Sequence, residues 1–263
     1  MFLVEELNME KIIINKSKSI GDVVFVLEGK DDEFRLFANI FEKIFSVTTI
    51  KCRSKSTDLR EYHLPDNRDS VVYLLNSKTS SIKSVDDNEY IESLFIKINE
   101  HFNIDISNAA IFYIWDRDKD SNKSEIVEKM LTKYQNSRDN EYEMQGLLLL
   151  SYPAIESFMI SCFENETDET FIENMKKYLT SKKYHYKKIN EEKIINATQV
   201  FLKKYKKILK KEFDIGDIDL NMKDNNLAIF KFEEDYYSNK QFYYYFSTII
   251  IALLDLGFIE LTE

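Results

Sequence analysis

Three short apolar runs, each followed by acidic residues, constrain the fold of this chain most strongly. They occupy residues 23–27 (VVFVL), 109–115 (AAIFYIW) and 146–150 (GLLLL). A run that is apolar at every position is typical of a strand buried on both faces of a sheet. Segments 31–45 and 124–134 carry apolar residues at helical spacing instead, so strands and helices are expected to alternate.

This alternation predicts an α/β fold, with a parallel sheet flanked by helices. A further strand is expected at 47–52 and a helix at 89–102, whereas 70–75 fits either a strand or part of a helix. Ligands of such sheets bind outside the carboxyl ends of the strands. The residues that follow the three apolar runs are therefore the candidate site.

Each of these runs is followed by carboxylates, namely Glu28, the group Asp116, Asp118 and Asp120, and Glu156. Carboxylates gathered in one place repel each other and lose hydration. A divalent cation relieves both costs, and oxygen ligands suit Mg²⁺ or Mn²⁺. A pair of such ions can activate water for phosphodiester cleavage. The alternative is a set of solvated loop acids.

Two other acidic motifs fit less well. An EF-hand loop opens with the spacing of Asp116, Asp118 and Asp120, but it needs Gly and Glu where this chain has Ser121 and Val127. A phosphatase with an aspartyl nucleophile also places Asp-x-Asp after a strand, but it lacks the Glu-Gly element at 28–29.

The pairing of EGKDD at 28–32 with DRD at 116–118 resembles the TOPRIM domain, over residues 23–158. YPAIESF at 152–158 is similar to a motif of one TOPRIM subgroup, which includes OLD-like nucleases and the effector subunits of PARIS-type anti-phage systems. The resemblance implies that Glu28 is a metal ligand or general base, and that Asp116 and Asp118 bind Mg²⁺. Asp120 and Glu156 would extend the metal site.

By resemblance, the chain is expected to be a metal-dependent nuclease that cuts RNA, such as tRNA, or DNA in phage defence. It has five Gly and no Walker-type loop, so an ATPase that controls it would be a separate protein. It also has no zinc finger, which disfavours a primase. The main rival is a non-catalytic binding or regulatory subunit on a TOPRIM-like scaffold, and another class of phosphoryl-transfer enzyme is a third hypothesis.

Basic residues lie among these acids. Lys30 is expected either to hold a scissile phosphate as part of the catalytic group or to pair with acids at the start of the helix. Arg117 and Lys119 point away from their acidic neighbours if the loop is extended. They would then face either substrate or solvent, and we expect solvent.

The second half of the chain differs, and we divide the chain into a TOPRIM-like domain at 1–163 and a helical domain at 164–263. Helices are expected at 169–179, 191–211 and 240–256. Residues 176–211 hold 13 Lys and two Glu, a net charge of +11. Lysines neutralise phosphates and tyrosines stack on bases, so this segment is expected to bind RNA or single-stranded DNA. The candidate contacts are Lys182, Lys183, Lys187, Lys188, Lys203, Lys204 and Lys207. A solvated helix face, or docking on a partner, is the alternative.

The remaining features concern the setting of the protein. The start has no signal-peptide pattern, and the longest apolar stretch, 249–254, is too short to span a membrane. Two cysteines fit a reducing cytoplasm. The apolar segment at 242–258 is expected to be core or a contact within a homo-oligomer.

Overall fold

The fold was taken from a computed structural model of the chain. It describes residues 11–28, 32–45, 48–49, 59–65, 67–77, 82, 93, 95–96, 99–100, 108–138, 146–165, 171–210 and 222–262. Gly29, Lys30, Cys52 and most of the helix expected at 89–102 lie outside the described residues.

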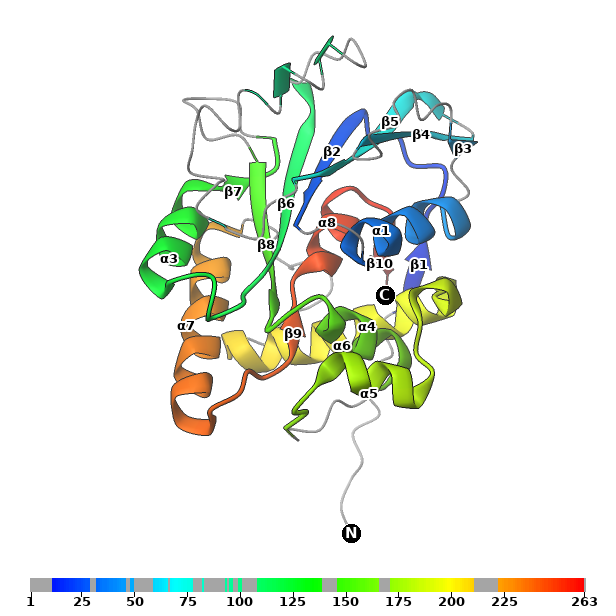
Figure 1. The fold of residues 1–263 in the computed structure, drawn as a ribbon. Coiled ribbons are helices and arrows are strands. Elements are labelled where there is room, and N and C mark those ends of the chain that lie inside the picture. The colour runs from blue at the N-terminus through cyan, green and yellow to red at the C-terminus, as the bar shows by residue number, and fades with distance from the viewer. Residues whose placement is uncertain are drawn as a thin grey trace.

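A mixed, mostly parallel sheet forms the centre of the molecule (Figure 1). Its strand order is β3-β4-β5-β2-β6-β8-β7, and β9 pairs with β8. The parallel strands are β5 (Asn67–Asn76), β2 (Asp22–Leu27), β6 (Ala110–Asp116) and β8 (Gly146–Tyr152). The antiparallel strands are β3 (Thr48–Thr49), β4 (Leu59–Leu64), β7 (Gln135–Asn136) and β9 (Phe246–Ser247). The α/β class is therefore confirmed, although the sheet is not wholly parallel.

Helices surround this sheet (Figure 1). They are α1 (Asp32–Lys43), α3 (Ser124–Lys133), α4 (Glu156–Phe163), α5 (Met175–Lys182), α6 (Glu191–Leu209), α7 (Met222–Lys240) and α8 (Ile249–Asp255), with the short 3-10 helix η3 (Tyr186–Lys188) between α5 and α6. In Figure 1, α4, α5 and α6 lie together below the sheet, at the end where β8 leads into α4.

The centre of the sheet is buried because helices cover it. Phe25 of β2 is fully buried, and its ring centroid lies 5.3 Å from that of Phe37 and 5.5 Å from that of Phe41 on α1. The ring of Phe112 on β6 stacks on it at 5.1 Å. Each such ring contributes roughly 1.5–3 kcal/mol by leaving water, which is why these strands read as unbroken apolar runs.

Segments from the C-terminal part of the chain complete this core. Asn226 of α7 donates a hydrogen bond of 2.9 Å to the carbonyl of Leu148 in β8. Phe258 packs on Phe45 with ring centroids 4.2 Å apart. β10 (Ile259–Thr262) pairs antiparallel with β1 (Lys11–Ile14), so the two ends of the described chain meet.

Several expected elements are found, and two expected helices begin later than predicted. The helix expected at 169–179 begins at Met175. Residues 70–75 form part of strand β5. The expected helix at 240–256 begins only at Ile249, because residues 242–246 are aromatic, buried or half-buried, and lead into strand β9. α7 was not predicted, since buried polar residues, including Asn225, Asn226 and Glu233, interrupt its apolar face. Among the described helices, none has the length and apolar character needed to cross a membrane.

Candidate acidic site at the carboxyl ends of the parallel strands

The ends of β2, β6 and β8 meet at one edge of the sheet. Leu27 is in register with Ile114, and Asp116 with Ser151. The backbone N–H of Glu28 donates to the carbonyl of Ile114 at 3.0 Å. In the other direction, the backbone N–H of Asp116 donates to Oε2 of Glu28. The parallel register thus places Glu28 directly beside Asp116.

Glu156 joins these two residues from the turn that follows β8. It is the first residue of α4, and only 5% of its surface is exposed. The backbone N–H of Ile155 donates to the Asp116 carboxylate, which ties this turn to the end of β6. The structure therefore brings Glu28, Asp116 and Glu156 together from three strand ends.

Two further acids, Asp32 and Glu33, lie in the first turn of α1 and were not among the predicted site residues. Their position just after the Glu-Gly element is the signal that could have identified them. Acids in that turn are ordinarily explained by the helix dipole alone. Here the charge of Glu33 acts on both Glu28 and Asp116.

Burial and mutual repulsion raise the pKa values of these carboxyl groups. The pKa of Glu28 rises to about 8, chiefly through burial; the hydrogen bond from Asp116 opposes this rise, and the charges of Glu33 and Asp118 add to it. Burial likewise raises the pKa of Glu33 to about 7. The pKa of Asp116 lies well above its ordinary range because of burial and the charges of Glu28, Glu33 and Glu156. Such a cluster favours protons or a cation.

A cation already lies against the cluster. The ammonium group of Lys176, on α5, lies 3.6 Å from Glu156 and 3.6 Å from Asp32. The side chain of Lys176 is 73% exposed, yet its pKa is raised, first by the charge of Glu156. Lys176 belongs to the basic stretch at 176–211, and no local sequence pattern connects it with the acids.

The donor atoms fit a hard divalent cation, because all of them are carboxylate oxygens. The arrangement of these oxygens in the structure, however, is not that of a formed metal site. Within the described part of the chain, no group of three or more His, Cys, Asp or Glu residues is arranged so that it could hold a metal ion. One oxygen of Glu28 accepts the Asp116 N–H, and Glu156 faces Lys176.

The other predicted acids lie at the margin of the cluster. Asp118 is half-buried, and its carboxylate accepts bonds from Ser121 Oγ at 2.6 Å and from the backbone N–H of Asp120 at 3.2 Å. The charge of Asp118 contributes to the raised pKa of Glu28. Asp120 is exposed. Lys30 lies outside the described residues, so the role expected for it stays a prediction.

The expectation that Arg117 faces solvent is wrong, because its side chain is fully buried. It points away from the acids, as an extended loop requires, but α7 covers that side. Lys119 is exposed, and its Nζ lies 3.7 Å from the centre of the Tyr237 ring on α7.

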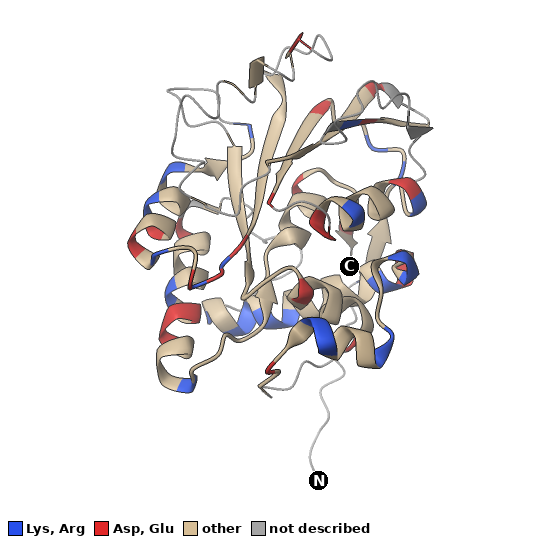
Figure 2. Cartoon of the chain, in the orientation of Figure 1, with Lys and Arg blue, Asp and Glu red and all other residues tan. Residues whose placement is uncertain are grey.

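The lysines expected to bind nucleic acid gather on α5, η3 and α6, which carry much of the blue in the lower part of Figure 2. Six of the seven candidates are exposed: Lys182, Lys183, Lys187, Lys188, Lys203 and Lys207. Lys204 is the exception, because its Nζ is buried and donates to the carbonyls of Tyr244 and Tyr245 at 3.2 and 2.8 Å. That contact satisfies the ammonium group internally and removes Lys204 from the binding surface.

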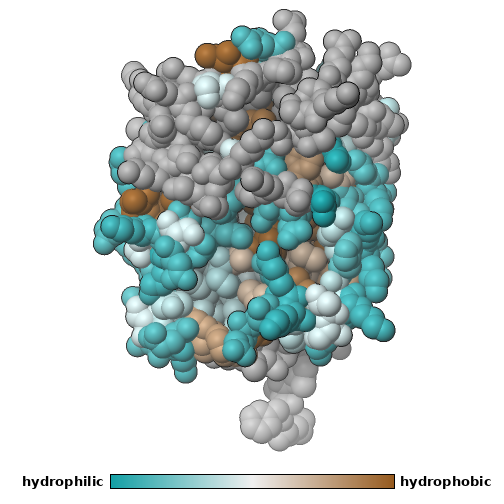
Figure 3. Space-filling view, in the orientation of Figure 1, coloured by the Kyte–Doolittle hydropathy of each residue, from teal (hydrophilic) through white to brown (hydrophobic). Residues whose placement is uncertain are grey.

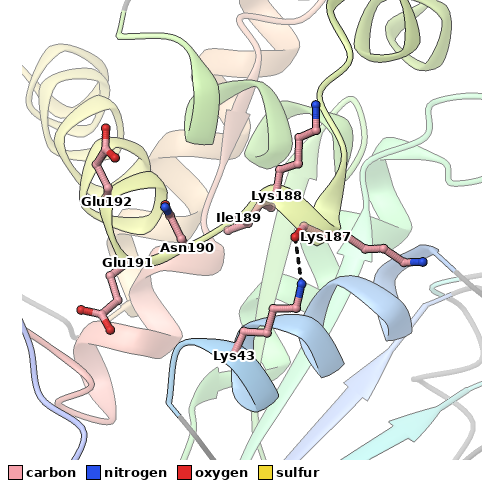
Figure 4. Close-up of a pocket in the computed structure, with 7 residues that line it drawn as sticks. All are labelled: Lys43, Lys187, Lys188, Ile189, Asn190, Glu191 and Glu192. Carbon is pink, nitrogen blue, oxygen red and sulfur yellow. Dashed lines mark hydrogen bonds between the residues drawn. The ribbon is translucent and has the colours of Figure 1, made fainter.

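A cavity of about 390 Å³ opens beside these lysines. Lys43, Lys187 and Lys188 line it, together with Ile189, Asn190, Glu191 and Glu192 (Figure 4). In Figure 4 the two glutamates point away from the lysines.

Both glutamates are paired with lysines other than those three. Glu191 forms an ion pair with Lys16 at 2.5 Å, and Glu192 with Lys193 at 3.9 Å. Lys43 and Lys188 donate to neutral backbone carbonyls, so no described acid compensates their charges. The cavity is therefore positive.

The positive cavity and the acidic site lie at opposite ends of α1. Asp32 begins this helix and Lys43 ends it, which separates them by roughly 16 Å along the helix axis. The face shown in Figure 3 is mostly polar where residues are described, with scattered apolar areas. The described residues thus form an acidic cluster with lysines close to it and at the other end of α1.

Comparison with known proteins gives no match: no family model, no curated protein and no solved structure matches the chain. The described fold and site define an α/β protein with a carboxylate cluster at its strand ends. The TOPRIM resemblance rests on the sequence motifs alone.

Proposed function

We propose that this protein is a TOPRIM-like nuclease that requires Mg²⁺ or Mn²⁺ and cuts phosphodiester bonds of RNA or DNA. The observation that carries the proposal is the contact between Glu28 and Asp116, with Glu156 beside them. Three carboxyl groups from three strand ends share one buried place, and the pKa values of Glu28 and Asp116 are raised. Groups with perturbed pKa values cluster at functional sites.

Glu28, Asp116 and Glu156 would hold the cation, with Asp118 at the margin. A bound divalent cation supplies an activated water and charge stabilisation at a phosphate. The carboxylates would turn from their present contacts toward the ion, since Glu28 now accepts the Asp116 N–H and Glu156 faces Lys176. If Glu28 stays off the ion, its ionised carboxylate can instead accept a proton from water.

Positive charge near the site gives the protein a means to attract a polyanion. Carboxylates alone repel phosphates, whereas lysines attract them. Lys176 lies at the carboxylates, and Lys43, Lys187 and Lys188 line the cavity at the other end of α1. A nucleic-acid strand lying along α1 would meet both groups. The resemblance further implies a role in phage defence under the control of a partner ATPase.

The rival function is a non-catalytic binding or regulatory subunit on the same scaffold. The absence of a metal-holding trio among the described residues favours it. In that case, the lysine-rich helices would bind nucleic acid or a partner, and the acids would have only a structural role. Mutation of Asp116 would then leave binding of nucleic acid and of partners unchanged.

Incubation of purified protein with tRNA and with plasmid, in Mg²⁺, Mn²⁺ or EDTA, separates the two functions. The nuclease is expected to cut in a divalent cation and not in EDTA, and Asp116→Asn is expected to abolish cutting. Asp235→Asn serves as the matched control, because Asp235 is exposed on α7. If Asp116→Asn cuts as fast as Asp235→Asn, the acidic cluster is not the active site.

A further inference from the structure

The loop after β6 alternates acids and bases in a way that gives it two faces. The charge of Asp118 raises the pKa of Glu28, and the charge of Glu28 raises the pKa of Asp116. Arg117 and Lys119, between and after them, contact residues of α7 instead. Residues 116–118 continue the strand without a turn, so their alternate side chains point to opposite sides, and the chain then turns at 119–121. One side of the loop lies at the acidic site and the other contacts α7.

Arg117 is held on the α7 side by three hydrogen bonds. Its Nε donates to Glu234 Oε1 at 2.8 Å. One terminal nitrogen donates to the carbonyl of Asn122 at 2.7 Å, and the other donates to Ser124 Oγ at 2.9 Å. The guanidinium also lies 5.9 Å from the centre of the Tyr243 ring. A planar guanidinium with several fixed partners has a single orientation.

Glu234 is in turn fixed by more than one donor. Besides Arg117 it accepts bonds from Ser124 Oγ at 2.7 Å and from the Tyr243 hydroxyl at 3.0 Å. Burial by itself would raise the pKa of Glu234, yet the pKa is lowered, because these hydrogen bonds and the charge of Arg117 stabilise the carboxylate. Glu234 is therefore a carboxylate, and hydrogen bonds fix the orientation of both its side chain and that of Arg117.

The backbone of the loop is also anchored on its strand side. The N–H of Arg117 donates to the carbonyl of Ser151 at 2.8 Å, and the N–H of Asp118 donates to that of Pro153 at 3.3 Å. Within the loop, the N–H of Asn122 donates to the carbonyl of Asp118 at 3.0 Å. Backbone bonds to the sheet thus hold the start of the loop. The Arg117 side chain bonds to Asn122 and Ser124 of the loop and to Glu234, and so ties the loop to α7.

We propose that Arg117 and Glu234 are positioning residues, which hold the loop 116–122 so that Asp116 and Asp118 face Glu28. The inference deepens the proposed function and rests on it for the metal. Residues that orient ligands without touching the metal typically change metal affinity 10–100-fold when mutated. α7, which the sequence did not reveal, would then be part of the acidic site's support.

The test compares Glu234→Gln with a matched control in the same protein. Asp255, on α8, accepts bonds from Arg138 at 3.0 Å and from Ser137 Oγ at 2.7 Å, so it too has an arginine and a serine partner, although Arg138 is 47% exposed and Arg117 is fully buried. Asp255→Asn removes the same kind of ion pair without touching the loop. Two quantities are measured for each variant: amide hydrogen exchange over 116–124 in EDTA, and the dissociation constant for Mn²⁺.

Glu234→Gln is expected to speed exchange of the loop amides and to weaken Mn²⁺ binding by about 10-fold. Asp255→Asn is expected to leave both at the wild-type value, although both variants lower the melting temperature. If Glu234→Gln lowers only the melting temperature and leaves both loop exchange and Mn²⁺ affinity unchanged, the pair is merely structural and the inference is overturned.

Two further outcomes keep the inference separate from the proposed function. If the wild-type protein binds no Mn²⁺, the metal-dependent function fails, and loop exchange alone decides whether Glu234 positions the loop. If Glu234→Gln does not fold, Ser124→Ala replaces it. Ser124 contacts both members of the pair, and its loss is expected to move the same two quantities by a smaller amount.

Discussion

The backbone N–H of Asp116 donates a hydrogen bond to the carboxylate of Glu28 across 88 positions of the sequence. The bond joins the end of β6 to the end of β2, and it forms because these strands are parallel neighbours in register. It also leaves the carboxyl group of Glu28 buried close to other acids. That burial makes the ionised form of Glu28 costly in the folded protein.

Stability is expected to depend on pH through Glu28. Its pKa rises from 4.5 to about 8 on folding, so the folded protein keeps a proton that the unfolded chain releases. This contribution is fully present below about pH 4.5 and is lost as the pH rises through about 8. In EDTA, the free energy of unfolding should fall by about 2–4 kcal/mol between pH 5 and 9, and Glu28→Gln should reduce that fall.

Denaturant unfolding at a series of pH values measures this effect. Mn²⁺ should restore much of the stability lost at high pH, because it binds the ionised carboxylates and not the protonated ones. Parallel curves for wild type and Glu28→Gln in EDTA would contradict the assigned burial cost of Glu28.

Glu233 provides a second buried acid outside the cluster. It is fully buried on α7, and burial raises its pKa to about 8, against the opposing effects of the Tyr244 N–H and the Lys204 charge. Its contribution to stability is likewise present at low pH and lost as the pH rises through about 8. Glu233→Gln should therefore flatten the dependence on pH.

The two variants should differ in their response to metal. Glu233→Gln is expected to keep the wild-type affinity for Mn²⁺, whereas Glu28→Gln weakens it. Isothermal titration with Mn²⁺ at pH 8 makes the comparison. An equal loss in both variants would show that global stability, and not the acidic cluster, governs metal binding.

Removal of the Lys176 ammonium is expected to tighten Mn²⁺ binding by a few-fold. This cation compensates Glu156 and Asp32, so it competes with a divalent ion for the same carboxylates. Because Lys176 is exposed, Lys176→Met should change stability by less than about 1 kcal/mol. Lys177→Met is the control, since Lys177 is an exposed neighbour on the same helix. Weaker binding in Lys176→Met alone would mean that Lys176 supports the bound ion's site.

The positive cavity predicts a salt-dependent contribution to nucleic-acid binding. Replacement of Lys43 and Lys187 by Ala should weaken binding of a single-stranded RNA and reduce the slope of log K against log salt by about 1 for each lost phosphate contact. Fluorescence anisotropy over a series of salt concentrations gives the slope. Lys204→Met is the contrast, because it should lower stability and leave the slope unchanged. A slope unaltered by the Lys43 and Lys187 changes would place the binding surface elsewhere.

Much of the sheet followed from local pattern. Strands β2, β6 and β8 were predicted from their apolar runs, because a strand covered on both faces admits few polar residues. That acids after these strands would meet also follows from topology, since parallel strands end at the same edge. Asp32 and Glu33 were missed because their position also suits an ordinary helix start. The TOPRIM assignment and the nuclease function stay predictions.

The apolar runs and the acids that follow them were thus determined by sequence alone, through the period of a strand and the polarity of a buried sheet. Tertiary structure alone decided that Arg117 turns inward to Glu234, that Lys176 reaches Glu156, and that Lys204 is buried. The physical reason is the same in each case. A charged side chain becomes buried or paired through partners distant in sequence, and no local period records where those partners will lie.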